Sequence, residues 1–219
     1  MGRKSKDLDF AVVAPSYDDM ILEIGKRGGK IYLARPEYLT VRARMFWPLT
    51  NKGKEVDADF VLCRKDGFYG DGRRPDSVEI GTLEDDLARR DFTVNAIALT
   101  EDGQYVDPFQ GLEDLKRMEL RTVGHAEDRF SEDALRLLRA IRFSITHGFI
   151  LSNDIRDCLH SKDMINLLDN VSEERIKDEL ENMFRANTYN ALDWFTHLDW
   201  LRKQVFRRSI WLMPTMRER

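Results

Sequence analysis

Short runs rich in hydrophobic, strand-forming residues alternate with turns along the first half of the chain, and within residues 56–63 apolar and polar residues alternate with a period of two. Four such runs stand between turns, at residues 8–13, 30–34, 38–46 and 56–63. This alternation is typical of β-strands that bury one face. A further run, residues 96–108, has Asp102 and Gly103 at its centre and predicts a hairpin. We therefore expect the first half of the chain to be rich in β-structure.

After about residue 125 the apolar residues recur at helical spacing instead. Residues 131–149 predict one helix, with Ser131 as its N-cap and acids in its first turn. Residues 172–185 repeat this style, and residues 190–206 place aromatic and aliphatic side chains at helical spacing. The change of pattern divides the chain into an α+β domain and an all-helical segment, residues 1–125 and 126–219.

Acidic residues interrupt two of the predicted strands, each time on one face. Asp7 and Asp9 stand one residue apart, so a strand places both carboxylates on the same face. Neighbouring carboxylates repel each other, and a divalent cation is the usual reason to hold them together. In residues 56–63, Asp57 and Asp59 also share a face. Two such strands in one sheet can gather three carboxylates around one or two Mg²⁺ ions, although the second strand alone also fits an edge strand with solvated acids.

Composition and charge narrow the class of protein without identifying a partner. The 219 residues are 42% hydrophobic and 34% charged, which is typical of a soluble globular protein. A formal net charge of −4 argues weakly against a general nucleic-acid coat protein, but a local basic surface can coexist with it. The two cysteines and four histidines show no disulfide or zinc pattern, and no membrane-span or signal-peptide pattern is visible. We therefore expect a cytoplasmic protein with reduced cysteines.

Three long segments carry a resemblance to one protein family. In the family's order along the chain, they are residues 73–99, 106–124 and 129–143. From about Arg3 to about Phe184 the chain resembles the bacterial-type (class II) tRNA nucleotidyltransferase and poly(A) polymerase family, the CCA-adding enzymes. The resemblance implies a nucleotidyltransferase head with a mixed or antiparallel sheet and a helical neck. It also implies Mg²⁺-dependent, template-independent addition of CMP or AMP to the 3′ end of tRNA or another RNA, with CTP and ATP as substrates.

The family's metal-binding acids can be carried over to this sequence. Its Asp-x-Asp pair matches Asp7 and Asp9. Its third acid lies on the strand just before an Arg-Arg-Pro turn, which begins here at Arg73, and this assigns the role to Asp59. The family often has Glu at that position, and Asp57 is the alternative. The resemblance therefore assigns metal binding and catalysis to Asp7, Asp9 and Asp59.

The stretch RRDFTVN matches the family's ribose and triphosphate motif. The match implies that Arg90 binds a phosphate, that Asp91 has an orienting role and that Asn95 contacts the sugar. The pattern alone offers another interpretation, in which residues 82–85 form a capping box that begins an ordinary amphipathic helix with solvated arginines. For the neighbouring Arg89, that second interpretation is preferred.

The segment EDALR matches the family's Glu-Asp-x-x-Arg motif, and the match implies that Asp133 and Arg136 select the base. Cytosine and adenine each present an amino donor beside a ring-nitrogen acceptor. A carboxylate next to a guanidinium complements that edge and mismatches uracil and guanine. Three residues apart on a helix, the two side chains could instead pair with each other. Arg139 and Arg142 continue the row and either reach phosphates or face water.

Two further groups lie in the helical segment. Residues 171–180 resemble a family segment of the neck in which Arg175 braces the nucleotide pocket, although a plain surface helix fits the pattern too. The basic end of the chain could hold an RNA backbone with Arg202, Lys203, Arg207 and Arg208. Aromatic residues among them either stack on a base or belong to the core, namely Trp200, Phe206 and Trp211.

The sequence departs from the family at both ends. Relatives carry a Gly-Gly-x-Val-Arg-Asp triphosphate cradle just before the acidic strand and further helical regions after the neck, and this chain shows neither. Gly28 and Gly29 are poor substitutes, because they are expected in a turn between strands. The chain could be a compact enzyme, part of a longer one, or an RNA-binding remnant with impaired catalysis; the retained acids favour activity. CCA addition, polyadenylation and the oligomeric state are not separated by sequence.

Overall fold

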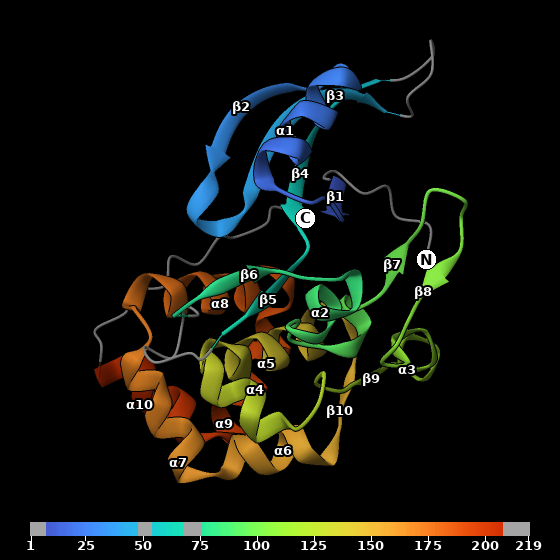
Figure 1. The fold of residues 1–219 in the computed structure, drawn as a ribbon. Coiled ribbons are helices and arrows are strands. Elements are labelled where there is room, and N and C mark those ends of the chain that lie inside the picture. The colour runs from blue at the N-terminus through green and yellow to red at the C-terminus, as the bar shows by residue number, and fades with distance from the viewer. Residues whose placement is uncertain (1–7, 48–53, 68–75, 208–219) are drawn as a thin grey trace. The chain divides into compact units, whose positions relative to one another are not determined.

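The computed structural model describes residues 8–47, 54–67 and 76–207, and the chain forms two compact units. The head unit comprises Met1–Phe68 and Asp76–Arg89, and the helical unit comprises Tyr69–Pro75 and Arg90–Arg219 (Figure 1). The boundary at residue 125 remains a prediction about where the catalytic domain ends.

A four-stranded mixed sheet forms the centre of the head unit, with strand order β1-β4-β3-β2. Strand β1 (Leu8–Val12) runs parallel to β4 (Lys54–Leu62). Strands β3 (Thr40–Trp47) and β2 (Lys30–Arg35) continue the sheet in antiparallel fashion. The predicted α+β class with a mixed sheet is confirmed, and the period of two predicted for residues 56–63 is seen in β4, where Ala58, Phe60 and Leu62 are buried.

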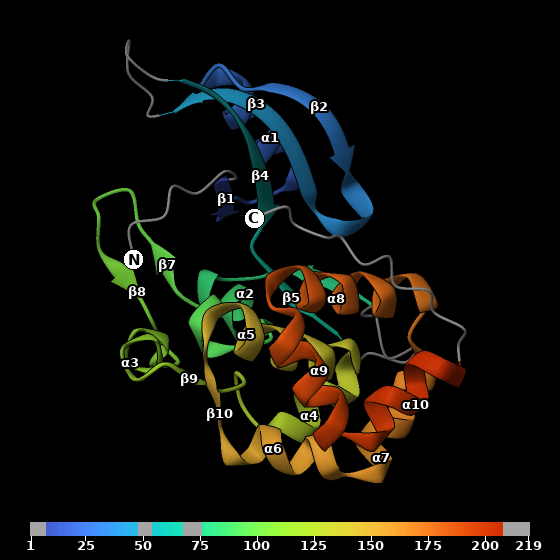
Figure 2. The same ribbon diagram turned by 180° about the vertical axis from the view of Figure 1, so that it is seen from behind.

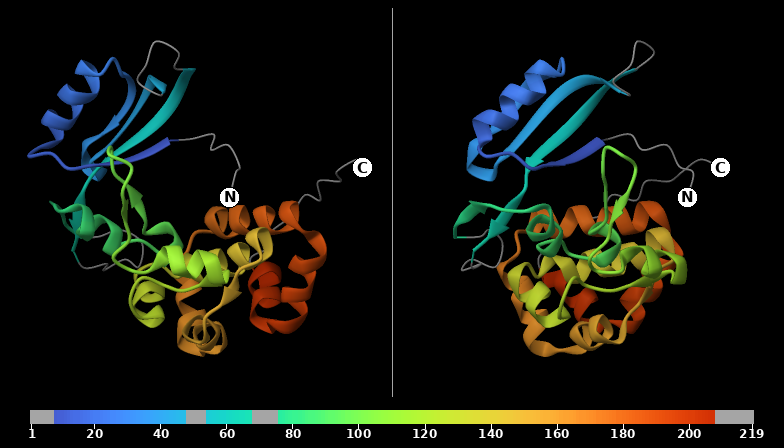
Figure 3. Two further views of the ribbon diagram at one scale, coloured as in Figure 1. Left: turned by 90° about the vertical axis from the view of Figure 1, so that its right-hand side faces the viewer. Right: turned by 45° about the vertical axis from the view of Figure 1, so that its right-hand side comes forward.

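Helix α1 (Tyr17–Lys26) covers one face of this sheet, as both views in Figure 3 show. Its buried Met20 and Ile24 pack on the apolar face, together with Ala43 and Phe60 of the central strands. The opposite face of the sheet is therefore left to the polar residues of the same strands. The sequence interpretation placed no helix here.

Gly28 and Gly29 end α1 instead of linking two strands, which corrects the sequence expectation. The amide of Gly29 donates to the Ile24 carbonyl at 2.9 Å, and Gly28 has a φ of +80°. This left-handed conformation is one that glycine adopts without strain at a helix C-terminus. The two glycines thus terminate a helix.

The remaining described elements of the head unit are a two-stranded ribbon, a 3₁₀ turn and a short helix. Strands β5 (Arg64–Asp66) and β6 (Val78–Ile80) pair antiparallel, a 3₁₀ turn η1 spans Pro36–Tyr38, and α2 spans Leu83–Ala88. The predicted capping box is present, since Thr82 and Asp85 each bind the other's backbone amide. Arg89 is not solvated as expected, because it binds the buried carboxylate of Asp86 with its Nη2 2.5 Å from Oδ1.

The helical unit contains most of the remaining elements. Its helices are α3 (Gly111–Arg117), α4 (Ala126–Glu132), α5 (Leu135–His147), α6 (Asn153–His160), α7 (Lys162–Asn166), α8 (Glu173–Ala186), α9 (Thr188–His197) and α10 (Asp199–Arg207). Two 3₁₀ turns, η2 (Thr93–Asn95) and η3 (Leu167–Asn170), and two short ribbons complete it, β7–β8 (Ala98–Leu99 with Tyr105–Val106) and β9–β10 (Glu119–Leu120 with Ile150–Leu151). The β7–β8 ribbon confirms the predicted hairpin.

Helix α5 is the centre of the helical unit, where it packs against α4, α6, α8 and α9 (Figure 2). Its Leu137, Leu138 and Ile141 are fully buried because they recur at helical spacing on the face that meets these neighbours. Among the described residues, no helix is both long and apolar enough to pass through a membrane.

The predicted single helix over residues 131–149 is wrong, because the chain leaves helical geometry at Asp133. Helix α4 ends at Glu132, Asp133 has an extended backbone (φ −152°, ψ 101°), and α5 begins at Leu135. Ser131 consequently lies inside α4 and is not an N-cap; His125 occupies that position. In the same way residues 190–206 are divided between α9 and α10 at the extended Leu198.

Candidate functional site

The parallel pairing of β1 with β4 brings two of the predicted metal-binding acids together. Asp9 and Asp59 are direct register partners on neighbouring strands, which lie about 4.8 Å apart in a sheet, so their side chains leave the sheet next to each other on the same face. This is the face opposite α1, since their neighbours Phe10 and Phe60 pack into the core on the other side. Asp7 lies outside the described residues.

Two arginines of β3 form ion pairs with the acids of β4 on this face. Arg42 is the register partner of Asp59, and its Nε and Nη2 lie 2.5 and 3.1 Å from the two carboxylate oxygens. Arg44 binds Asp57 in the same way, at 2.9 and 3.4 Å. The hydrogen bond from Arg44 lowers the pKa of Asp57. These four residues are called the charge ladder below; the sequence interpretation assigned no role to either arginine.

The donor set on this face fits Mg²⁺. Mg²⁺ prefers oxygen ligands and is commonly held by one or two carboxylates together with substrate phosphates, which is what Asp9 and Asp59 can offer. Within the described ranges there is no group of three or more histidine, cysteine or acidic residues that could hold a metal. The two carboxylates would therefore act with further ligands, and Asp59 would have to share or release Arg42.

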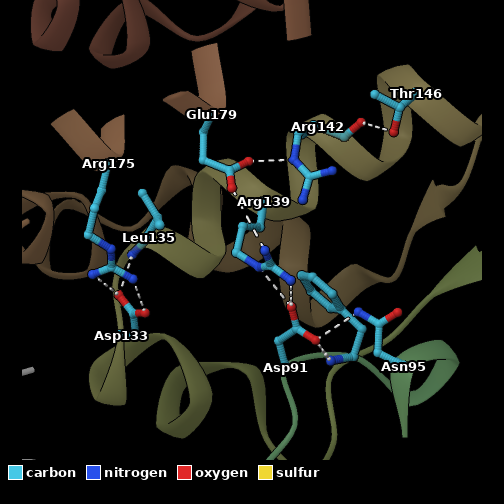
Figure 4. Close-up of polar contacts among 10 residues, drawn as sticks. Asp91, Asn95, Asp133, Leu135, Arg139, Arg142, Thr146, Arg175 and Glu179 are labelled. Carbon is cyan, nitrogen blue, oxygen red and sulfur yellow. Dashed lines mark hydrogen bonds and ion pairs between the residues drawn. The ribbon is translucent and has the colours of Figure 1, made fainter. Parts of the chain in front are cut away.

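In the helical unit, Asp91 is the centre of a half-buried polar network (Figure 4). Its Oδ1 accepts hydrogen bonds from the Phe92 amide at 2.8 Å and from the Asn95 side chain at 2.9 Å. Its Oδ2 accepts two from Arg139, at 2.8 and 2.6 Å. Burial raises the pKa of Asp91, but Arg139, Asn95 and the amide outweigh it and lower the pKa overall. Asp91 thus holds the Asn95 side chain in this structure, while the orienting role that the family motif implies for Asp91 stays a prediction.

Glu179 of α8 extends this network and is a residue that sequence reasoning missed. Its Oε2 lies 2.5 Å from Nε of Arg142, and its Oε1 lies 3.8 Å from Nη1 of Arg139. Arg139 and Arg142 therefore contact carboxylates in this structure. The signal was present in the sequence, because Glu179 falls among the apolar positions Ile176 and Leu180 of the buried face of α8.

Asp133 and Arg136 do not share a helical face, because the helix breaks at Asp133. The Asp133 carboxylate accepts two hydrogen bonds from Arg175, at 3.2 and 2.6 Å, and one from the Leu135 amide (Figure 4). Arg136 instead donates to Glu132 at 2.7 Å and to the Arg129 carbonyl at 2.9 Å. The two side chains thus have separate partners, and Arg175 braces Asp133 directly.

A second buried acid, Asp114, fixes the turn that carries Asn95. Thr93 of η2 donates to Asp114 at 2.6 Å, and Nε of Arg121 lies 2.9 Å from both of its oxygens. Gly111 permits this packing, because a Cβ there would lie 2.1 Å from the Thr93 carbonyl oxygen. These residues fix the turn that carries Asn95, and sequence reasoning did not single them out.

The remaining predicted residues lie at the start and at the end of the helical unit. Arg90 is half-buried in the turn after α2. Arg202 and Lys203 are exposed on α10, where both contact Asp199. Arg207 belongs to α10, but its side chain, like all of Arg208, lies outside the described part.

The core alternative holds for Trp200, one of the three aromatic residues considered for stacking. Its indole NH donates to the Leu159 carbonyl at 2.8 Å, and its ring packs against the hydrophobic core. Both Trp211 and the side chain of Phe206 lie outside the described part. The described part of α10 therefore offers exposed cations, and its Trp200 ring stabilises the fold.

Glu179→Gln is expected to lower the free energy of unfolding by about 1 kcal/mol, because the amide keeps the shape but loses the charge facing two arginines. The matched control is Glu181→Gln on the same helix, whose partners Lys177 and Arg185 lie one turn away near the surface. It should cost no more than about 0.5 kcal/mol. Urea denaturation of both variants measures the difference, and equal losses would show that Glu179 has no special role.

Comparisons with known proteins identify the family. Residues 1–121, more than half of the chain, match the family described as Poly A polymerase head domain. The chain belongs to this family. The resemblance seen in its motifs is thereby confirmed.

Individual relatives are CCA-adding enzymes. That of Streptococcus uberis is 47% identical over 135 residues, which cover 60% of this chain and 33% of that protein. That of Geobacillus stearothermophilus is 38% identical over 189 residues, 84% of this chain and 42% of that protein. The crystal structure of the Bacillus stearothermophilus CCA-adding enzyme in complex with CTP matches with a TM-score of 0.73 at 34% identity, covering 91% of this chain and 45% of that one. The chain therefore spans less than half the length of these relatives.

Proposed function

We propose that this protein is an RNA nucleotidyltransferase that adds CMP and AMP to the 3′ end of tRNA without a nucleic-acid template. The observation that carries the proposal is the register pairing of Asp9 with Asp59, which sets two carboxylates side by side on the polar face of the head unit's sheet. Family membership and the CCA-adding relatives support the same reaction class. The proposal also gives a role in nucleotide binding to the charged side chains that ion pairs hold in the helical unit, such as Arg139 and Asp133.

In the proposed reaction the RNA 3′ hydroxyl oxygen bonds to the α-phosphorus of the nucleotide. The bond from that phosphorus to the bridging oxygen breaks, pyrophosphate leaves, and the hydroxyl proton passes to solvent. Asp9 and Asp59, with Asp7, would hold Mg²⁺, which when bound lowers the pKa of the hydroxyl and offsets charge on the phosphates. The pairing of β1 with β4 fixes the backbone at Asp9 and Asp59. The two carboxylates would therefore orient the cation, and with it the hydroxyl and the phosphates.

The helical unit would bind the nucleotide. Asn95, held by Asp91, is assigned to the sugar, and Arg90 and Arg139 are assigned to phosphates. Arg142 binds Glu179, which also lies near Arg139. Arg142 would therefore affect nucleotide binding only indirectly, by helping to hold Arg139 in place. Asn95 and Arg139 are held in place by Asp91 before any ligand arrives, which lowers the entropy cost of binding.

Base selection is assigned to Asp133 and Arg136, with Arg175 as the brace of Asp133. A carboxylate and a guanidinium complement the hydrogen-bonding edges of cytosine and adenine and mismatch those of uracil and guanine. Arg136 would have to exchange Glu132 for the base. The proposal therefore includes a local change of ion pairs when CTP or ATP binds.

Incubation with tRNA that lacks its 3′ CCA, and with each labelled nucleoside triphosphate in turn, tests the proposal. Incorporation of C followed by A supports it. Long runs of A alone would identify a poly(A) polymerase, the second candidate, which the family description favours. A gel shift of RNA without any incorporation would leave an RNA-binding protein and refute the proposed activity.

A further inference from the structure

The charge ladder contains an ion pair that competes with the proposed cation site. Arg42 approaches Asp59 from β3, while Asp9 lies beside Asp59 on β1. Asp59 thus stands between the Arg42 guanidinium on one side and the Asp9 carboxylate on the other. Both of its carboxylate oxygens already accept a hydrogen bond from Arg42.

The geometry of this pair is that of a two-pronged guanidinium–carboxylate contact. Such pairs are among the stronger exposed ion pairs, since two parallel hydrogen bonds hold one geometry. The side chains remain 55% and 34% exposed, so water and ions can reach them. An exposed pair of this kind can be exchanged for another partner without unfolding the sheet.

We propose that Arg42 is a latch on Asp59, which a divalent cation must displace before it can use that carboxylate as a ligand. The inference rests on the proposed function, because it concerns the same acid pair. A cation that binds Asp59 meets two costs that Arg42 imposes: the ion pair has to break, and a positive group stands within a few ångströms of the ion. Arg42 therefore raises the cation concentration at which the site fills.

The neighbouring rung supplies a matched control. Arg44 and Asp57 belong to the same two strands, use the same atoms in the same geometry and are exposed to a similar degree. Asp57 is not the register partner of Asp9. A substitution of Arg44 removes an equal charge from the same sheet face without releasing Asp59.

The test measures Mn²⁺ binding, without nucleotide or RNA, to the wild type, Arg42→Gln and Arg44→Gln. The electron paramagnetic resonance signal of free Mn²⁺ gives the concentration of unbound ion. Arg42→Gln should bind Mn²⁺ about three- to ten-fold more tightly than the wild type. Arg44→Gln should stay within about two-fold, because screening weakens its effect on the more distant site. Thermal melting should show both variants folded, within about 4 °C of the wild type.

Arg42→Lys provides a second measurement, because it keeps the charge but loses the two-pronged contact. Its affinity should fall between those of the wild type and Arg42→Gln. An Arg42→Gln affinity that is unchanged or weaker overturns the latch. Asp9→Asn separates the two claims: if it abolishes Mn²⁺ binding while Arg42→Gln changes nothing, only the latch fails. If Asp9→Asn binds Mn²⁺ as the wild type does, both the latch and the proposed cation site fail.

Discussion

Asp9→Asn is expected to lower nucleotide incorporation by about 10³-fold while leaving the fold intact. The amide removes a negative ligand beside Asp59, and loss of the charge stabilisation that a metal gives costs several kcal/mol in the transition state. The side chain is exposed, so the free energy of unfolding should change little. Single-turnover incorporation of labelled CMP into tRNA that lacks its CCA end measures the effect.

Asp57→Asn is the matched control, because it removes the same charge from the same sheet face. Asp57 pairs with Arg44 and is not opposite Asp9. Incorporation by this variant should stay within about three-fold of the wild type. If Asp57→Asn were as damaging as Asp59→Asn, the third acid would have been assigned to the wrong residue. Retention of more than a tenth of the activity by Asp9→Asn would contradict the role of Asp9.

The ion pair between Asp91 and Arg139 is expected to contribute strongly to the stability of the fold. Asp91→Asn should lower the free energy of unfolding by about 2 kcal/mol at pH 7, because it leaves the half-buried Arg139 without its main counter-charge. The value lies below the cost of breaking a fully buried pair, since Arg139 is partly exposed. Thermal unfolding should show a midpoint lower by about 4–8 °C.

The same variant should show a specific pH dependence. The pKa of Asp91 is lowered in the folded protein, so its contribution is present above the unfolded value of about 3.9 and is lost as pH falls through the folded pKa. The gap between the wild type and Asp91→Asn should therefore shrink below about pH 4. Asp199→Asn on the exposed end of α10 is the control and should cost no more than about 0.5 kcal/mol. A gap of equal size at pH 7 and pH 3 would argue against the ion pair as its cause.

The strands of the head unit could be predicted because the cause of their pattern is local. A period of two in residues 56–63 already separates the acids from Ala58, Phe60 and Leu62, which are buried in the structure. Helix α1 had local signals too: Ser16 caps it, and Tyr17, Met20, Ile21 and Ile24 follow a helical spacing. Its apolar face is short and lies between two predicted strands, so no helix is assigned to this region from the sequence.

The candidate site was harder to predict, because its decisive contacts join distant parts of the chain. Helix propensity runs without a break through Asp133; the ion pair with Arg175 and the cap on Leu135 accompany the interruption seen there. Only the register of β3 against β4 shows that Arg42 faces Asp59. A sequence indicates residue types and their faces, but which charge meets which is set by tertiary pairing.

The charge ladder has a consequence for how β3 finds its alignment with β4. Sliding one strand by two residues would keep every face as it is and would still give opposite charges, with Arg42 meeting Asp57 and the next arginine meeting Glu55. The ion pairs alone therefore cannot choose between these alignments. The apolar side can, because the slipped alignment would set Lys54 against the buried Met45. The place of Arg42 opposite Asp59 thus depends on hydrophobic side chains on the reverse of the sheet, the face that carries neither of the two charges.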